Sequence, residues 1–220
     1  MMKQVCITGA NRGIGLALTR YLADNNHIFC LCRKRADDLV AIPNTTIIED
    51  IDINHHSNRL AAIKQLPNLD LVILNAGILQ KDSNEIIEHE QTLQQQLQTN
   101  AISPLIFARM LIPHLKPNAK IVLMTSRMGS MSDNSSGQLD GYRMSKAALN
   151  AAGCNLAHDL KEQGIGVFLI HPGYIKTEMT NNQGYLSPEE AAQNICKLIS
   201  TLTLENTGQF WHAEGHKLPW

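Results

Sequence analysis

Tyr142 and Lys146 have the residue types and the spacing that proton transfer requires. If the alanine-rich segment GYRMSKAALNAA around them is helical, residues four apart lie on one face, and the ammonium of Lys146 can sit beside the phenol of Tyr142. A nearby positive charge favours the phenolate, so we expect the pKa of Tyr142 to fall from its ordinary value of about 10 toward neutrality. The pair alone is weak evidence, because two exposed side chains on a helix can have the same spacing.

A glycine-rich run, TGANRGIG, occupies residues 8–15, between a short apolar segment and a segment of helical periodicity. This is the setting of a dinucleotide-binding turn. Gly9 permits a tight turn, Gly13 lets the backbone approach a pyrophosphate, and Gly15 lets the helix pack against the sheet. The helix N-terminus would present free amides to negative charge. The predicted cofactor contacts in this run are Gly9, Asn11, Arg12, Gly13, Ile14 and Gly15.

The residue that would contact the adenosine ribose is basic. Roughly 20 residues after a dinucleotide-binding turn, an acidic side chain usually accepts the ribose 2'-hydroxyl of NAD. Arg33 stands at this place, and a guanidinium can bind a 2'-phosphate through two hydrogen bonds, whereas a carboxylate would repel it. We therefore expect NADP(H) to be favoured over NAD(H), with Arg12 in reach of the same phosphate. The alternative is that both arginines are solvated loop residues.

Seven short apolar or β-branched segments alternate with stretches long enough for a crossover helix. Segments that are apolar throughout suit strands buried on both faces. The pattern predicts one α/β domain over residues 1–220, a doubly wound Rossmann fold with helices on both faces of a mostly parallel seven-stranded sheet. Strands are expected at 4–8, 27–32, 45–49, 69–75, 119–125, 166–171 and 208–212. Helices are expected at 14–25, along Leu93, Leu97 and Ala101, around Tyr142, and after the capping residue Ser187.

Composition excludes several classes of protein. With 220 residues, 44% of them hydrophobic and 18% charged, the chain is expected to be soluble and globular. A net charge of -1 without a basic run argues against a nucleic-acid partner. Five scattered cysteines, no signal-peptide pattern and no bilayer-spanning segment predict the cytoplasm and no membrane contact. Among nine histidines, His55 and His56 would point apart, and His212 and His216 lack a matching ligand pair, so no metal is expected.

Taken together, the motifs resemble the short-chain dehydrogenase/reductase family over nearly the whole chain. The glycine-rich run matches TGxxxGxG, residues 75–77 match NAG, and Tyr142 with Lys146 matches YxxxK. Asn100 and Ser126 fit the family's catalytic asparagine and serine, and HPGYIKTEM fits its PG motif. YRMSKAALN, HPGYIKTEM and the C-terminal residues are most similar to the compact carbonyl reductases of the sniffer and C-factor type, which share the long interval before the tyrosine.

The resemblance implies roles for individual residues. Tyr142 would donate a proton to a carbonyl oxygen that Ser126 hydrogen-bonds, and Lys146 would hold the nicotinamide ribose and lower the phenol pKa. Asn100 would use its carbonyl to hold a water that links Lys146 to solvent. The residues also allow Ser126 to be a strand-end cap and Asn100 a helix interruption before Pro104. The family pattern further assigns Asp52 and Ile53 to the adenine, Asn75, Ala76 and Gly77 to the nucleotide, and Pro172, Gly173, Ile175 and Thr177 to the nicotinamide end.

The expected function is NADPH-dependent reduction of small aldehydes or ketones. The segment between Thr177 and Ser187 is short, which implies a small lid, an open site and loose substrate selection. The alternative is an NADPH-binding redox sensor with little turnover, against which the full set of catalytic residue types argues. Small residues on the tyrosine helix, Ala147, Ala148 and Ala151 among them, belong either to the core or to a dimer seam, and the resemblance favours a homodimer or a tetramer.

Overall fold

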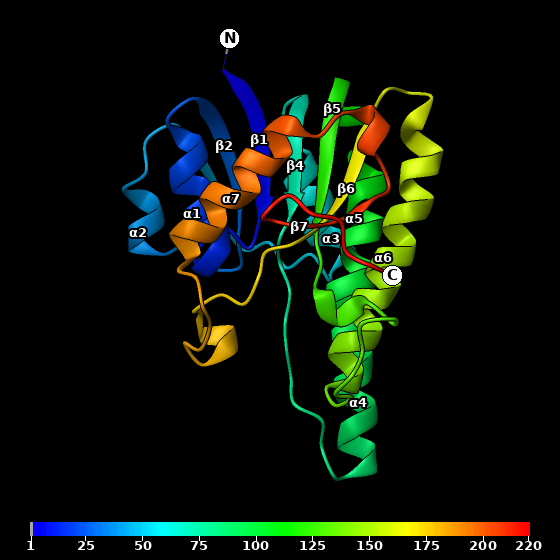
Figure 1. Cartoon of the computed structure of the whole chain (residues 1–220). Coiled ribbons are helices and arrows are strands. Elements are labelled where there is room, and N and C mark those ends of the chain that lie inside the picture. Colours follow the sequence, from blue (N-terminus) through cyan, green and yellow to red (C-terminus); the bar gives the residue numbers. More distant parts are fainter. Residues whose placement is uncertain (1) are drawn as a thin grey trace.

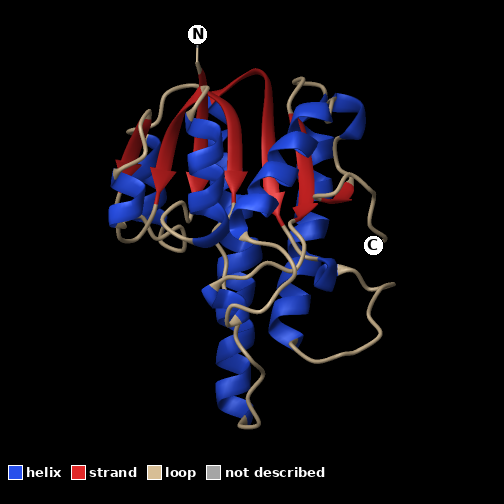
Figure 2. Ribbon diagram, turned by 60° about the vertical axis from the view of Figure 1, so that its left-hand side comes forward, coloured by secondary structure: helices blue, strands red, loops and turns tan. Residues whose placement is uncertain are grey.

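The computed structural model describes residues 2–220 and shows a seven-stranded sheet between two layers of helices (Figure 1, Figure 2). The strand order is β3-β2-β1-β4-β5-β6-β7, and every neighbouring pair is parallel. The predicted fold is confirmed, with a sheet that is parallel throughout. The strands are β1 (Lys3–Thr8), β2 (Asn26–Leu31), β3 (Thr45–Ile48), β4 (Leu69–Leu74), β5 (Leu115–Met124), β6 (Gly166–His171) and β7 (Phe210–His212).

The described part of the chain has seven α-helices, most of which pack against the sheet. One layer holds α1 and α7, which lie side by side (Figure 1). The other holds α3, α5 and α6, with α4 packed along α6. The bounds are α1 (Gly13–Ala23), α2 (Asp37–Val40), α3 (His56–Ile63), α4 (Ile86–Leu97), α5 (Ser103–Leu111), α6 (Asp140–Lys161) and α7 (Pro188–Thr201).

Alternate residues of the strands enter two separate cores, as strand geometry requires. On β2, Ile28 and Cys30 face α1 and α7, whereas Phe29 and Leu31 face the opposite layer. Cys30 is a free buried thiol, and burial raises its pKa to about 12. It is therefore a small apolar residue of the core.

The start of α7 shows how local chemistry fixes an element. The hydroxyl of Ser187 accepts a hydrogen bond from the Glu190 amide at 3.2 Å, and the Glu190 carboxylate accepts one from the Ser187 amide at 2.8 Å. Pro188, at the first helical position, has no amide hydrogen to leave unpaired. The predicted capping residue is confirmed. By contrast, α1 runs from Gly13 to Ala23, which is shorter than the predicted 14–25 because the chain already enters β2 at Asn26.

The helix predicted along Leu93, Leu97 and Ala101 is interrupted. It ends at Leu97, continues as a π-helical turn at Gln98–Ile102, and resumes as α5. A π-turn widens the backbone and is frequent at functional sites. The turn carries Asn100, and the fully buried side chain of α4 is Gln96, whereas the two leucines are half-buried.

Gln96 and Asn100 fasten the segment that follows β4, a feature we call the amide clamp. Asn100 accepts a hydrogen bond from the Ile78 amide and donates one to the Ile78 carbonyl, both at 2.8 Å. Gln96 does the same with Gln80, at 3.0 and 3.3 Å. Alternate residues of an extended chain lie about 6.6 Å apart, close to the rise of about 6 Å between helical residues four positions apart, so both pairs of hydrogen bonds can form at once. A Cβ at position 141 would lie 2.5 Å from the Gln96 amide nitrogen, so Gly141 leaves it room.

Replacing Gln96 with leucine tests the clamp. Gln96→Leu leaves the amide and carbonyl of Gln80 without partners, and we expect a loss of about 1–3 kcal/mol in the free energy of unfolding, measured by urea denaturation. Gln91→Leu, at an exposed position of the same helix, should change it by less than about 0.5 kcal/mol. Equal losses in both variants would contradict the assignment.

Candidate active site

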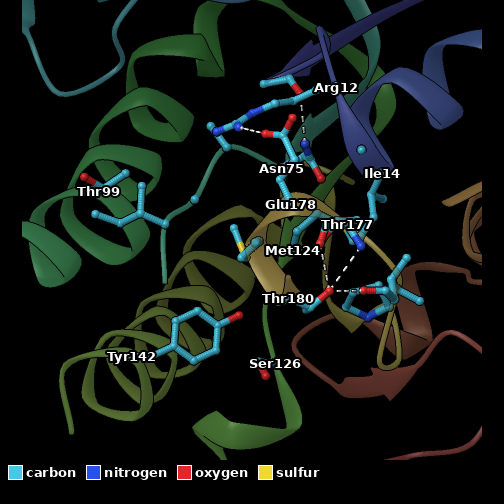
Figure 3. Close-up of a pocket in the computed structure, with 18 of the residues that line it drawn as sticks. Arg12, Ile14, Asn75, Thr99, Met124, Ser126, Tyr142, Thr177, Glu178 and Thr180 are labelled. Atoms are coloured by element: carbon cyan, nitrogen blue, oxygen red, sulfur yellow. Dashed lines mark hydrogen bonds and ion pairs between the residues drawn. The ribbon is translucent and has the colours of Figure 1, made fainter. Parts of the chain in front are cut away.

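A cleft of about 990 Å³ opens at the carboxyl ends of the strands, where the order reverses between β1 and β4 (Figure 3). Open α/β sheets bind ligands at this place. Gly15 and Asn100 lie outside the lining, directly beneath it. The other predicted site residues line the cleft: Gly9, Asn11, Arg12, Gly13, Ile14, Arg33, Asp52, Ile53, Asn75, Ala76, Gly77, Ser126, Tyr142, Lys146, Pro172, Gly173, Ile175 and Thr177.

The glycine-rich turn is held by the residues after β4. Gly9 has a φ of +66°, a conformation that suits glycine, and a Cβ on Gly15 would lie 2.1 Å from the Gly9 carbonyl oxygen. The side-chain amide of Asn75 donates to the carbonyls of Thr8 and Gly9, at 3.1 and 3.3 Å. The Thr8 hydroxyl in turn accepts from the Asn75 and Ala76 amides. Turn and NAG motif therefore form one rigid unit.

The residues around the start of α1 fit a dinucleotide phosphate. The residue before the helix, Arg12, provides no side-chain hydrogen bond to the first-turn amides. Gly13 and Ile14 line the cleft at this point. Free amides and the positive end of the helix dipole together favour an anion.

Two arginines line the cleft, and they differ in whether an acidic side chain neutralises their charge. Arg12 forms an ion pair with Glu178, on the 3-10 turn Glu178–Thr180, so the pair joins two sides of the cleft (Figure 3). Arg12 would have to leave this partner to reach a phosphate, a condition that the sequence did not indicate. Arg33 is exposed, and within residues 2–220 it has no acidic partner within 4.0 Å. Of the two guanidinium groups, that of Arg33 is therefore the one that can bind a phosphate without first breaking an ion pair.

Ser126, Tyr142 and Lys146 converge on the opposite part of the cleft. The ammonium nitrogen of Lys146 lies 5.7 Å from the centre of the Tyr142 ring, so both side chains are on one face of α6. Lys146 is buried and donates a hydrogen bond to the Met124 carbonyl at 2.8 Å. The Ser126 hydroxyl accepts from the Met128 amide at 3.1 Å and caps the turn Arg127–Gly129. This is the capping role that the sequence allowed, and Ser126 still faces the cleft.

Burial dominates the protonation of the tyrosine and the lysine. It raises the pKa of Tyr142, and a hydrogen bond with Ser126 offsets part of this rise. It lowers the pKa of Lys146 from 10.5 to about 8. The predicted lowering of the Tyr142 pKa by Lys146 is therefore wrong for the protein by itself, because loss of water outweighs a charge that is directed at a backbone carbonyl. At neutral pH the phenol holds its proton and the amine is largely protonated.

Asn100 lies under the floor of the cleft, beside Lys146. A Cβ on Gly77 would lie 3.1 Å from its side-chain oxygen and 3.7 Å from the Lys146 nitrogen. Its amide nitrogen also donates to the Ser145 hydroxyl at 3.0 Å, in addition to the bonds to Ile78. The side chain thus has a structural role, and water binding by its carbonyl stays a prediction.

Several lining residues were not singled out in the sequence. Four of them, Gln94, Gln95, Gln98 and Thr99, come from the glutamine-rich segment at residues 90–102. The apolar spacing of this segment predicts an amphipathic helix and gives no sign that its polar residues face a cleft. His171 ends β6, and burial lowers its pKa to about 3, so the ring is neutral. The additional lining residues include Gln80, Gln94, Gln95, Gln98, Thr99, Met124, His171, Glu178 and Met179.

The prediction made for the C-terminal histidines is wrong. His212 and His216 were expected to lack a matching ligand set, but the structure places their ring nitrogens and the Glu214 carboxylate within 4.8 Å of one another. A turn between β7 and the C-terminal residues brings them together, which the spacing alone did not reveal. His55 and His56 are exposed and belong to no such group among residues 2–220.

Residues 3–185 match the short chain dehydrogenase family. The chain belongs to this family. It is 33% identical, over all of both chains, to a 1-hydroxy-2-glutathionyl-2-methyl-3-butene dehydrogenase of Rhodococcus. Its structure is similar to the carbonyl reductase Sniffer of D. melanogaster, with a TM-score of 0.92, 31% identity and full coverage of both chains. An NADPH-bound carbonyl reductase from chicken fatty liver has a TM-score of 0.90 and 28% identity, covering 100% of this chain and 99% of its own.

The protein is thus a short-chain oxidoreductase with carbonyl reductases among its structural neighbours. Within residues 2–220, no helix is both long and apolar enough to cross a membrane. On α6, Ala151 is exposed and Ala147, Ala148 and Ala152 are half-buried. Their use as a dimer seam stays a prediction.

The buried charge of Lys146 should be visible in stability. Because its pKa is lowered to about 8 in the folded state, Lys146 binds more protons in the unfolded chain between pH 8 and 10, and this residue by itself makes stability rise with pH across the window, whereas buried thiols such as Cys30, whose pKa is raised, act in the opposite direction. Lys146→Met should add about 1–3 kcal/mol to the free energy of unfolding at pH 7, and this advantage over the parent should shrink as the pH rises from 8 to 10, as measured by urea denaturation of both proteins at several pH values. A variant less stable than the parent at pH 7 would contradict this account.

Proposed function

We propose that this chain is an NADPH-dependent carbonyl reductase that acts on small aldehydes and ketones. The observation that carries the proposal is the meeting of Ser126, Tyr142 and Lys146 in a cleft whose other part fits a dinucleotide. The likeness to Sniffer and to the NADPH-bound chicken enzyme supports it.

Bound NADPH would supply a hydride to the carbonyl carbon of the substrate. Tyr142 holds a proton at neutral pH, because burial raises its pKa, and can give it to the carbonyl oxygen. The Ser126 oxygen accepts from the Met128 amide, and its O–H, which hydrogen-bonds Tyr142 in the cleft without substrate, can turn to the same carbonyl oxygen and stabilise negative charge there. Proton donor and oxyanion donor therefore serve one atom.

Lys146 has three N–H groups, and the Met124 carbonyl accepts from one of them. The remaining two are available for ribose hydroxyl groups and for returning a proton to Tyr142. Since its pKa is about 8, the amine loses its charge within the range in which many enzymes are assayed. Reduction should accordingly slow as the pH rises above about 8.

Removing the phenol oxygen separates catalysis from binding. Tyr142→Phe should reduce kcat for carbonyl reduction by at least about 100-fold, the size of a general-acid effect, with little change in NADPH affinity. The measurements are NADPH oxidation followed by absorbance and a titration of cofactor fluorescence. Tyr174→Phe, which changes a tyrosine outside the cleft lining, is the matched control. Substantial turnover by Tyr142→Phe would remove the tyrosine from this role.

Arg33 is proposed to select NADPH through its 2'-phosphate. Arg33→Asp should raise KM for NADPH at least about 10-fold and lower or spare that for NADH, because a carboxylate repels the phosphate and can accept a ribose hydroxyl. Lys34→Asp makes the same charge change at an exposed neighbour outside the cleft lining. The assignment fails if the NADPH preference of Arg33→Asp equals that of the parent.

A second candidate is the oxidation of alcohols that carry a glutathionyl group. The full-length relative from Rhodococcus is named for such a substrate, and one wall of the cleft is polar, with Gln80, Gln94, Gln95 and Gln98. A panel that contains simple aldehydes, quinones and hydroxyalkyl glutathione adducts separates the two. Cofactor binding without turnover across the whole panel would favour the sensor.

A further inference from the structure

The C-terminal turn gathers two imidazoles and a carboxylate. Ligand atoms of His212, Glu214 and His216 all lie within 4.8 Å of one another. His212 ends β7, and its side chain is mostly buried, whereas Glu214 and His216 are exposed. We call this group the HEH cluster. None of its members lines the cleft.

The backbone of this turn is fixed by its own hydrogen bonds. The His212 amide donates to the His216 carbonyl at 2.8 Å, and the Gly215 amide donates to the His212 carbonyl at 2.9 Å. Gly215 has a φ of +95°, which only glycine adopts easily. The Ala213 amide anchors the turn to the His171 carbonyl at 2.9 Å. The backbone of the three residues is therefore held in place by the fold, so their side chains start from positions close to one another.

Internal hydrogen bonding does not explain why three polar rings meet here. Within residues 2–220 the ring of His212 has one hydrogen bond, from the Glu214 amide at 3.2 Å, and lies 3.6 Å from the Glu214 carboxylate. It stacks on His216, with ring centres 4.7 Å apart, and meets His171 edge-on at 5.1 Å. The Nδ1 atom of His171 is buried without a partner. The imidazole rings gathered here therefore contain more nitrogen atoms than there are hydrogen-bond partners for them.

Two histidines and one carboxylate are a donor set that Zn²⁺ accepts while keeping a position for water. Zinc bonds of about 2.1 Å place ligand atoms about 3.4 Å apart, so ligand atoms that now lie up to 4.8 Å apart must move closer by up to about 1.4 Å. A metal lies in the plane of each imidazole ring, and the His216 ring must therefore turn out of its stack with His212. Both Glu214 and His216 are exposed and can rotate freely.

The charges around the cluster permit a cation. Glu214 supplies one negative charge. Arg127 is close enough for its charge to act on His212, but that charge is paired with Asp133. Lys217 lies over the Trp211 ring, 5.5 Å from its centre. We infer that His212, Glu214 and His216 bind a divalent transition-metal ion, with Zn²⁺ as the best fit to this donor set.

Such an ion would stabilise the C-terminal segment and take no part in proton transfer. The Trp220 carbonyl accepts hydrogen bonds from the amide and hydroxyl of Ser132, at 2.9 and 2.6 Å, and so joins the C-terminal residues to the loop that follows Ser126. Metal bound at the turn would tie this junction to β7. The expected consequence is a higher melting temperature with Zn²⁺.

The test is calorimetric titration of ZnCl2 into tag-free protein, with thermal melting in parallel. All proteins carry Cys154→Ala, because this is the least buried thiol and could bind zinc itself. The parent should bind one ion and melt at a higher temperature. Glu214→Gln and His216→Ala should bind at least about 10-fold more weakly and lose the shift, and the double variant His55→Ala/His56→Ala, with two exposed histidines removed elsewhere, should behave as the parent.

Several outcomes would overturn the inference. These are the absence of saturable binding by the parent, equal binding by Glu214→Gln and His216→Ala, or loss of binding in the His55/His56 variant. Circular dichroism and NADPH titration establish that each variant is folded. The proposed reductase activity does not depend on the result, since the HEH cluster lies outside the cleft lining.

Discussion

A buried ammonium is the constraint on which the catalytic half of this structure depends. Lys146 lies inside α6 with one N–H on the Met124 carbonyl, the last residue of β5. Removing a cation from water is unfavourable, and a single carbonyl compensates only part of this cost. The surrounding elements must therefore be rigid enough to keep the charge there. Gly129 shows how tight the packing is, since a Cβ at that position would lie 2.7 Å from the Lys146 carbonyl carbon.

The sheet holds both halves of the cleft in place through the ends of its strands. The carboxyl ends of β1 and β4 hold the glycine-rich turn through Thr8 and Asn75, and the end of β5 holds Ser126 and the partner of Lys146. Parallel pairing places all these strand ends at one edge of the sheet. Residues separated by more than a hundred positions in the chain consequently share one site.

The sequence predicted those parts of the molecule that depend on local chemistry. Apolar strands, the capped start of α7 and the glycine-rich turn each follow from neighbouring residues, and all were found. The pKa of Tyr142 could not be predicted, because it depends on how much water the assembled cleft excludes. The pairing of Arg12 with Glu178 and the meeting of His212 with Glu214 and His216 depend on loop conformation, which residue spacing does not determine. Nothing in the sequence indicated the π-helical turn at Asn100, apart from a polar residue at this position of an amphipathic helix.

The amide clamp has a consequence for how this site can change over evolutionary time. Gln96 and Asn100 hydrogen-bond only the backbone amides and carbonyls of Ile78 and Gln80, and not their side chains. Any non-proline residue at 78 or 80 offers the same amide and carbonyl. Side chains at positions 78 and 80 can therefore be exchanged one at a time without loss of the hydrogen bonds that hold this segment. Substrate selectivity can change in this way while the fold of the cleft wall is kept.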